Sequence, residues 1–195
     1  MTPAPGGDDA AERSRLLVAG QSQALQLALT GAPLGDVLEM LVRTAELQAN
    51  GSFFGSIMLL DGKHLRHGAA PSLPDEYNRG IDGSEIGPTA GSCGTAAYFG
   101  HAVIVTDIAT DPLWVNYREL ALRHGLRACW STPFLARDGS VLGTLALYYR
   151  DTRGPNAGDR EAVQVIGETA AAIVETRRKA AAVAARAQPT GRNGP

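Results

Sequence analysis

Two apolar segments separated by a short turn constrain the fold most. They run over residues 126–136 and 140–149, and Arg137-Asp138-Gly139 lies between them. A short connection that contains Gly is typical of a hairpin, in which two antiparallel strands pair along their length. This is the strongest hairpin signal in the chain, and it predicts an antiparallel sheet.

A second hairpin and three longer helical patterns surround the first hairpin. Residues 53–60 form a short apolar run, and Asp61-Gly62 leads into a second predicted strand at residues 63–69. Amphipathic helices place apolar side chains every three or four residues. This spacing occurs in residues 8–29, 34–49 and 159–187.

Between the two hairpins the sequence predicts short helices and one short strand. The predicted helices are residues 75–80, 93–99 and 111–124, and the predicted strand is residues 101–106. Ser92 is the expected N-cap of the helix at 93–99, and Asp111 is the expected cap before Pro112. The Gly-containing loop at residues 82–91 either presents backbone amides to a cavity or simply crosses over, and both interpretations stay open.

The order of these elements predicts an α+β domain with an antiparallel sheet of five to six strands. We expect the terminal helices to cover one face of the sheet. The short helices are expected on the other face, with a ligand cavity beneath them.

The chain of 195 residues fits one domain with tails. Residues 1–8 and 188–195 contain Pro and Gly and are expected to be disordered. An N-terminal helix at residues 9–31 precedes a domain at residues 32–179, whose last helix continues to about Ala187. The final segment is too short for a further domain, so any domain that acts together with this one is expected on a separate protein.

Composition excludes several classes of partner. The formal net charge of −2 gives no general attraction to nucleic acid, although residues 177–186 are locally basic. The longest apolar run, residues 141–149, is about half of the roughly 20 residues that a membrane span needs. Asp8 and Asp9 lie where a signal peptide would be basic and then apolar. We therefore expect a cytoplasmic protein with neither nucleic acid nor a membrane as partner.

No catalytic or metal-binding group can be assigned from the sequence. The chain has 2 Cys and 4 His, and the histidines do not combine into a set with metal-ligand spacing. No Ser-His-Asp or paired-carboxylate arrangement can be argued either. The cofactor is unknown.

Cysteine and aromatic residues between Gly91 and Tyr149 are the candidates for a ligand pocket. Cys93 near a helix N-terminus is expected to have a lowered thiol pKa, but free Cys is also a common small core residue. Aromatic rings wall a pocket for an apolar ligand or simply cap the core. The ligand-pocket candidates are Cys93, Trp114, Tyr117, Cys129, Trp130 and Ser131.

Several short motifs follow one another in order along this stretch. They are Gly91-Ser92-Cys93-Gly94, Ala97-Tyr98, Val105-Thr106-Asp107-Ile108, Asp111-Pro112-Leu113-Trp114, Tyr117-Arg118, His124-Gly125-Leu126-Arg127-Ala128-Cys129-Trp130-Ser131 and Gly143-Thr144-Leu145-Ala146-Leu147-Tyr148-Tyr149. Together they resemble the GAF domains that precede outputs in bacterial sensor kinases and cyclic-di-GMP enzymes, over roughly residues 34–179. The resemblance implies a ligand-sensing and dimerisation module, but the fold hosts many ligands and does not name the signal.

This sequence lacks signature residues of three better-defined branches of the family, which argues against the functions of those branches. Residues 150–160 lack the Asn-Lys and Asp-Glu signature of cyclic-nucleotide-binding members, and Asn116 and Tyr117 replace the Cys-His pair of bilin-binding members. Cys93 is similar to one cysteine of the free methionine-(R)-sulfoxide reductases. Their catalytic Gly-His-Ile-Ala-Cys-Asp segment is replaced by Asp111-Pro112-Leu113-Trp114.

The resemblance also implies two arrangements that spacing alone does not give. It brings the helix of Cys93 over the strand of Cys129, so the two thiols are a candidate redox pair. It implies a homodimer through the N- and C-terminal helices, whereas the alternative is that the last helix only covers its own sheet. We expect a small-molecule- or redox-sensing module; the alternatives are a thiol-based reductase and a ligand-free interaction domain.

Overall fold

The computed structural model describes residues 7–187 and has two helical layers around one sheet. The helices are α1 (Gly7–Leu29), α2 (Leu34–Gln48), α3 (Asp75–Ile81), α4 (Gly91–Phe99), the 3-10 helix η1 (Pro112–Trp114), α5 (Arg118–Arg123) and α6 (Ala157–Ala187). The strands are β1 (Phe54–Asp61), β2 (His64–Ala69), β3 (Ser84–Glu85), β4 (Val103–Val105), β5 (Ala128–Leu135) and β6 (Val141–Tyr149). Of the residues expected to be disordered, 1–6 and 188–195 lie outside the described residues, whereas residues 7 and 8 are the first of α1.

The six strands form one antiparallel sheet in the order β3-β2-β1-β6-β5-β4. Both predicted hairpins are present, as β1–β2 and β5–β6, and the predicted α+β class is confirmed. The short strand β3 lies in the segment that was expected to be a loop, and it pairs with β2. Two residues are too few to display the alternation that identifies a strand in a sequence.

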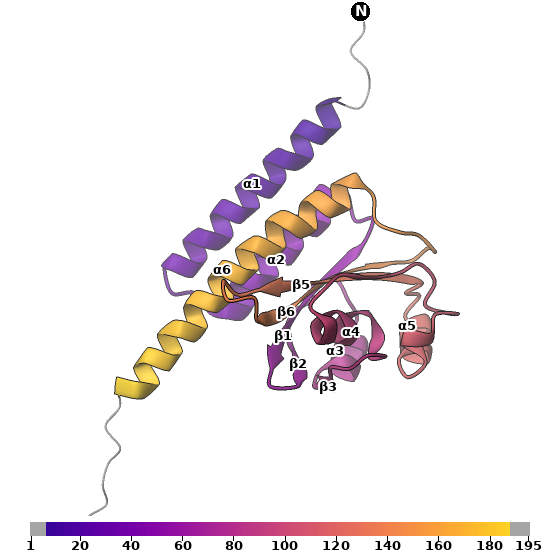
Figure 1. Cartoon of the computed structure of the whole chain (residues 1–195). Helices are drawn as coiled ribbons and strands as arrows, with labels where there is room; N and C mark the ends of the chain where they lie inside the picture. Colours follow the sequence, from indigo (N-terminus) through magenta and orange to yellow (C-terminus); the bar gives the residue numbers. More distant parts are fainter. Residues whose placement is uncertain (1–6, 188–195) are drawn as a thin grey trace, which may run out of the picture.

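Helices α1, α2 and α6 lie on one face of the sheet, and α3, α4 and α5 lie on the other (Figure 1). We call these the helical face and the cavity face. Alternation along the strands divides the core between them. On β6, Leu145, Leu147 and Tyr149 belong to the core of the helical face, whereas Ala146 and Tyr148 belong to that of the cavity face.

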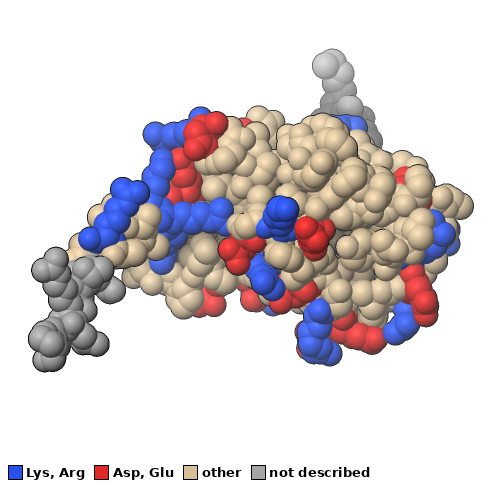
Figure 2. All heavy atoms as spheres, turned by 60° about the horizontal axis from the view of Figure 1, so that its bottom comes forward, with Lys and Arg blue, Asp and Glu red and all other residues tan. Residues whose placement is uncertain are grey.

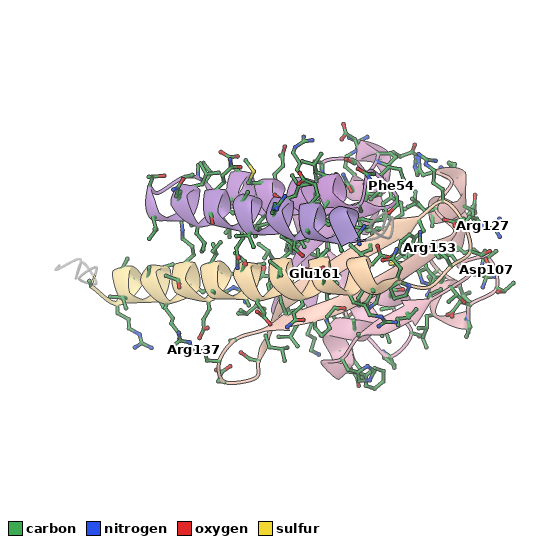
Figure 3. The ribbon with its side chains drawn as sticks, turned by 90° about the horizontal axis from the view of Figure 1, so that it is seen from above. Phe54, Asp107, Arg127, Arg137, Arg153 and Glu161 are labelled. Carbon is green, nitrogen blue, oxygen red and sulfur yellow. The ribbon has the colours of Figure 1, made fainter. Side chains whose placement is uncertain are left out.

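Helix α1 packs against α2 and α6. Leu17 and Ala24 are buried, and Gly20 approaches α2 so closely that a Cβ there would lie 2.1 Å from Thr44 Oγ1. In the view from above, α6 runs alongside α1, and Glu161 accepts a hydrogen bond from Ser14 Oγ at 2.6 Å (Figure 3). The predicted packing of both terminal helices on one face is therefore present.

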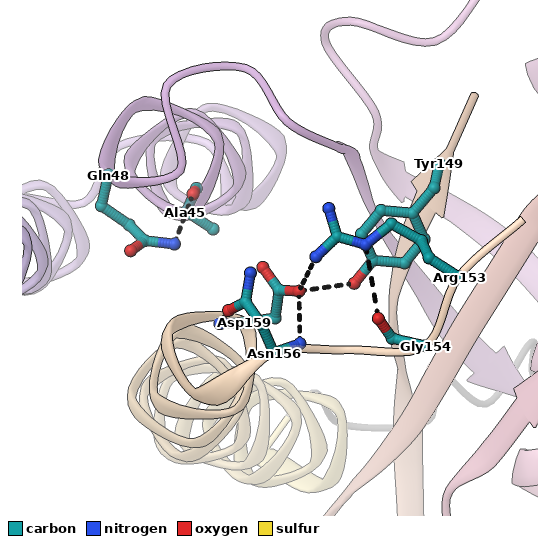
Figure 4. Close-up of polar contacts among 7 residues, drawn as sticks. All are labelled: Ala45, Gln48, Tyr149, Arg153, Gly154, Asn156 and Asp159. Atoms are coloured by element: carbon teal, nitrogen blue, oxygen red, sulfur yellow. Dashed lines mark hydrogen bonds and ion pairs between the residues drawn. The ribbon is translucent and has the colours of Figure 1, made fainter. Parts of the chain in front are cut away.

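The start of α6 is fixed to the end of β6 by a buried carboxylate. Asp159 Oδ2 accepts hydrogen bonds from Tyr149 Oη (3.2 Å), Arg153 Nη2 (3.1 Å) and the Asn156 amide (2.8 Å) (Figure 4). The Asp159 amide in turn donates to Asn156 Oδ1 at 2.9 Å, which completes a reciprocal cap of the helix. We call this set the Asp159 hub.

The basic residues near the end of α6 make structural contacts. Lys and Arg side chains gather where α6 projects from the body of the protein (Figure 2). Arg177 Nη2 donates to the carbonyls of Ala28 and Ala32, and Arg178 Nη2 donates to those of Leu60 and Leu142. These two arginines thus satisfy carbonyl groups of α1, of the turn after it, and of strands β1 and β6.

Two local predictions need correction. The segment predicted as one helix at 111–124 is two, η1 and α5, because the chain turns at residues 115–117 and Arg118 there bonds to the Ile108 and Asp111 carbonyls. Asp111 does cap η1, since its Oδ1 accepts from the Leu113 amide at 2.9 Å. Ser92 is not an N-cap, because α4 begins at Gly91 and the Ser92 hydroxyl bonds to a strand instead.

Candidate functional site

A small, mostly apolar cavity lies on the cavity face, between α3, α4 and the sheet. Its free volume is about 30 Å³. The residues that line it come from strands β1, β2, β3 and β6, from helices α3, α4 and η1, and from the loops beside α4 and η1. They are Met58, Leu65, Tyr77, Ile81, Ser84, Ala90, Gly91, Ser92, Cys93, Gly94, Trp114, Tyr117 and Tyr148.

Helix α4 brings its first turn to the edge of this cavity. Gly91 has φ +62°, in the left-handed region that favours glycine, and a Cβ there would lie 3.5 Å from the Tyr117 ring. Cys93 is the third residue of the helix, and its side chain lines the cavity. Glycine at position 91 therefore lets α4 start where the thiol reaches the cavity.

A chain of hydrogen bonds joins the cavity wall to the sheet. Trp114 Nε1–H donates to Ser92 Oγ at 3.1 Å, and Ser92 Oγ–H donates to the Cys129 carbonyl at 3.3 Å. Trp114 and Ser92 are both buried. The position of η1 is thereby coupled to α4 and to β5.

Three aromatic rings form the most enclosed part of the wall. Tyr148 packs edge-to-face against Tyr77, at 5.5 Å between ring centroids, and against Trp114 at 6.4 Å. The Tyr148 hydroxyl is 3.7 Å from Cys93 Sγ. Burial raises the pKa of Tyr77 and of Tyr148 well above the usual value, so both phenols stay neutral.

The two thiols are neighbours with opposite pKa shifts. Hydrogen bonding from the Cys129 side chain is the largest influence that lowers the pKa of Cys93, to about 6, and Ser131, Tyr148 and Thr144 act in the same direction against burial. Burial raises the pKa of Cys129 well above the usual value. Cys93 is partly exposed, whereas Cys129 is 1% exposed. Cys93 is therefore both the more exposed and the more readily ionised of the two thiols.

Three buried hydroxyls lie on the same face of the sheet beneath α4. Ser56 and Ser131 pair with Ala146 from either side, and Thr144 lies two residues along β6. All three are fully buried, and none of their side-chain oxygens has a hydrogen-bond partner among the described residues. Unpaired hydroxyls of this kind are uncommon inside proteins.

The structure brings most of the predicted pocket residues together. Cys93, Trp114 and Tyr117 line the cavity, and Cys129 and Ser131 lie on the same sheet face directly behind it. Trp130 does not belong to this group. It alternates with Cys129 along β5, so it lies on the helical face, where Arg160 stacks over its ring at 5.6 Å.

Among the aromatic residues of the cavity wall, Tyr77 and Tyr148 were not singled out from the sequence as pocket candidates. Tyr148 alternates with Tyr149 on β6, and this period of two was available as a signal. Tyr77 lies on a separate helix, and no local pattern connects it with the cavity.

Neither a metal-binding cluster nor a membrane-spanning helix occurs over residues 7–187. This part of the chain contains no group of three or more His, Cys, Asp and Glu side chains placed to hold a metal ion. Within the same range no helix has the length and apolar character needed to cross a membrane.

Comparison with known proteins gives consistent matches. The sequence model of the GAF domain matches residues 31–175. The methyl sulfide methyltransferase-associated sensor of Methanosarcina acetivorans is 37% identical over 161 residues, which is 82% of this chain and 16% of that protein. This chain therefore matches only a small part of a much longer relative.

Solved structures resemble the fold at low sequence identity. A GAF sensor protein from Burkholderia vietnamiensis has a TM-score of 0.66 and 16% identity, and the match covers 86% of this chain and 98% of that one. The free methionine-R-sulfoxide reductase of Neisseria meningitidis has a TM-score of 0.66 and 17% identity, with coverage of 92% and 98%. At such identities these likenesses establish the fold alone.

Proposed function

This chain belongs to the GAF domain family, and we propose that it is a sensory module that receives its signal in the cavity beside Cys93. In this proposal the signal is a small molecule or a change in the oxidation state of Cys93 and Cys129. The module transmits the signal through a homodimer of its terminal helices. The relative from M. acetivorans is named as a sensor, which supports this role.

One observation carries the proposal: adjacent residues of β6 connect the cavity with α6. Tyr148 lines the cavity, and Tyr149 points to the other face and donates to Asp159 at the start of α6. A change that displaces Tyr148 shifts the backbone that also carries Tyr149. The Asp159 hub then passes the displacement to α6.

The outer face of α1 supports a helical dimer. Val18, Leu25 and Leu29 are 59%, 39% and 87% exposed. They fall on one stripe with alternating spacings of four and three residues, as in a coiled coil. The exposed members of this stripe are Ala11, Arg15, Val18, Ser22, Leu25 and Leu29. On α6 the exposed Val183 lies in the part that projects beyond the sheet.

The mechanism requires two packings of the dimeric bundle. A ligand or a disulfide shifts an equilibrium only by the difference in its free energy between the two states. We propose that the reduced, empty cavity favours one packing and the occupied or oxidised cavity favours the other. The output is a separate signalling protein that distinguishes them.

Two free cysteines, one buried and one partly exposed, suit a reducing compartment. We propose that the module lies in the cytoplasm.

Native mass spectrometry of freshly purified protein tests the dimer and reports any bound ligand or disulfide. The double substitution Leu25→Glu and Leu29→Glu is expected to abolish the dimer, because it puts charges on the stripe. Gln23→Glu changes an exposed residue outside the stripe and is the matched control. A monomer in the unmodified chain would contradict the homodimer.

Hydrogen exchange tests the connection from the cavity to α6. Trp114→Phe removes the hydrogen bond to Ser92 and is expected to speed amide exchange in the first turns of α6. Val115→Ala, at a neighbouring residue that is 64% exposed, should leave it unchanged. Equal exchange in α6 for both variants would overturn the proposed route.

A thiol-based reductase is the second candidate, favoured by the position of Cys93 in Gly91-Ser92-Cys93-Gly94 and by the fold shared with the Neisseria enzyme. Turnover of free methionine-(R)-sulfoxide with dithiothreitol, lost in Cys93→Ser, would establish it. No turnover would exclude this reductase activity.

A further inference from the structure

A second and larger pocket lies on the helical face, where α6 packs on β5. Its free volume is about 510 Å³, which is within the roughly 300–1,000 Å³ of ordinary pockets for organic ligands. Strand β5 contributes Trp130, Thr132 and Phe134 to the wall, and α6 contributes Arg160 and Gly167 among others. We call this pocket the α6 groove.

Two polar side-chain atoms in the wall of the α6 groove have no hydrogen-bond partner among the described residues. They are the indole N–H of Trp130 and the hydroxyl of Thr132, which lie two residues apart and therefore on the same face of β5. Trp130 is 6% exposed, so its N–H is removed from bulk water as well as unpaired. Because an indole N–H can only donate and an unpaired buried donor is unfavourable, this group points to a ligand that accepts a hydrogen bond.

Glycine at position 167 leaves space in the groove on the side of α6. Gly167 lies in the interior of a helix of 31 residues, where glycine is unfavourable relative to alanine. A Cβ at this position would meet no atom within 4 Å. Packing among the described residues therefore does not require glycine here, in contrast to Gly20 of α1, where a Cβ would overlap Thr44. The open space beside Gly167 is room that the body of a bound molecule would use.

Arg160 and Glu168 are the charged residues of the wall, and they lie at different ends of the groove. They are eight residues apart, which is about 12 Å along the helix axis. The exposed Arg160 guanidinium lies over the Trp130 ring, 5.6 Å from the ring centroid. None of the ion pairs found within residues 7–187 includes Arg160. The end of the groove at Trp130 therefore has both a positive charge and an unpaired donor.

We propose that the α6 groove binds an organic monocarboxylate whose body is an apolar aryl or alkyl group. The carboxylate accepts a hydrogen bond from the Trp130 indole N–H and pairs with Arg160, whose side chain leaves the ring face to meet it. The apolar body lies beside Gly167 and against Phe134. This inference goes beyond the proposed function, because the binding needs neither the cavity beside Cys93 nor a dimer.

A single carboxylate suits these groups better than other anions. A guanidinium binds a carboxylate through two parallel hydrogen bonds, and the carboxylate keeps further lone pairs for the indole N–H. A phosphate dianion or a dicarboxylate would bring a second negative charge to a wall that offers one cation, Arg160, and the carboxylate of Glu168. The charge of the wall therefore matches a monoanion.

An added β-strand is a poorer occupant of the groove. Strand β4 pairs with Cys129, Trp130 and Ser131 of β5, so the rest of β5 lies beyond that pairing. Pro133 lies in this part of β5 and has no N–H to offer to another strand. Proline at such an edge protects it from strand addition.

The main experiment observes the two indole N–H groups of the chain by proton–nitrogen NMR, with hydrocinnamate as the probe. Trp130→Phe identifies the Trp130 signal by its loss. We expect hydrocinnamate to shift that signal with a dissociation constant of about 1 mM or below. The Trp114 signal should stay in place, because its N–H already donates to Ser92. A Trp130 signal that does not move would overturn the proposal.

Two analogues of the probe separate the contributions of its parts. Hydrocinnamide has the same shape but a neutral head, and it should bind about tenfold more weakly, because hydrogen bonds to charged groups are the stronger ones. Acetate lacks the apolar body and should also bind at least about tenfold more weakly. Equal affinity for hydrocinnamide and hydrocinnamate would refute recognition of a carboxylate.

Substitution of Arg160 tests the charge. Arg160→Gln should weaken the binding of hydrocinnamate about tenfold or more and should change the binding of hydrocinnamide much less. Arg150→Gln is the matched control, since Arg150 is also exposed and stacks over an aromatic ring, that of Phe54, at 4.8 Å. An equal loss in both variants would reduce the effect to the net charge of the protein and contradict a built site.

Gly167→Leu tests the space. The new side chain should fill the groove and abolish binding of hydrocinnamate, while stability is retained or raised because a glycine leaves the helix interior. Ala172→Leu, at an exposed residue of the same helix that does not line the groove, is the control and should bind as the unmodified chain does. Urea denaturation checks that both variants fold. Unchanged binding in Gly167→Leu would place the probe elsewhere and reject the groove.

A second copy of the chain is the alternative occupant. The double substitution Leu25→Glu and Leu29→Glu, which is expected to abolish the dimer, should bind hydrocinnamate as the unmodified chain does. Loss of binding in this variant would assign the groove to the dimer and overturn the inference. A Trp130 signal that moves with protein concentration before any probe is added would have the same meaning.

Discussion

The two faces of the sheet differ in the kinds of side chain that they carry. The helical face is packed with fully buried aliphatic side chains such as Val37, Leu41 and Ile166, and its buried carboxylate is hydrogen-bonded by three donors. The cavity face holds aromatic rings, two thiols, unpaired hydroxyls and a small void. One face is therefore packed mainly with aliphatic side chains, and the other combines a void with thiols and phenols. Unpaired polar atoms occur on both, since Trp130 Nε1 and Thr132 Oγ1 on the helical face also lack a partner among the described residues.

The largest expected effect is on the helical face. Leu41→Ala removes a fully buried side chain from the centre of that core and should lower the free energy of unfolding by about 2–5 kcal/mol. Urea denaturation measures this change. Leu47→Ala, on the same helix but 62% exposed, is the control and should change stability by less than about 0.5 kcal/mol. Similar effects for the two variants would show that α2 does not carry the core.

The next largest effect is expected at the Asp159 hub. Asp159→Ala leaves the Tyr149 hydroxyl and Arg153 without their shared acceptor and should cost about 2–4 kcal/mol. Asp159→Asn keeps one acceptor oxygen and should cost less. Denaturation of both variants tests the order, and an equal loss would show that charge rather than hydrogen bonding fixes α6 to β6.

The smallest effect should have the opposite sign. Ser56→Ala removes a buried hydroxyl that has no hydrogen-bond partner within the described residues, so the free energy of unfolding should stay the same or rise by up to about 1 kcal/mol. Ser52→Ala changes an exposed serine that is not one of the three buried hydroxyls, and it serves as the control. A clear loss of stability for Ser56→Ala would remove the contrast between the two faces.

Most of the fold was predictable because its signals are local. Apolar spacing located the helices now seen as α2 and α6, and Gly-containing turns located both hairpins. The break between η1 and α5 was missed, because Arg118 stabilises the turn there through hydrogen bonds to the Ile108 and Asp111 carbonyls. Contacts of this kind leave no periodic trace in a sequence.

The site was predictable only in part, for the same reason. Cys93 and Trp114 were identified by residue type, and the structure places both at the cavity. Trp130 was grouped with them, but its strand position puts it on the other face. The sequence leaves the face of Cys129 open, and pairing of β5 with β4 and β6 settles it. The helices that a strand side chain faces depend on strand pairing and register, which are set by contacts between distant parts of the chain.

The length of α6 makes it a lever arm. The helix has 31 residues, and its last hydrogen bonds to other described elements come from Arg177 and Arg178. Residues 179–187 therefore extend about 14 Å beyond these contacts. Asp159 lies near the other end, about 42 Å from Ala187 along the axis. A tilt of about 10° over that length would carry the far end of the helix through roughly 7 Å. A small change in the direction of α6 is therefore enlarged at its tip.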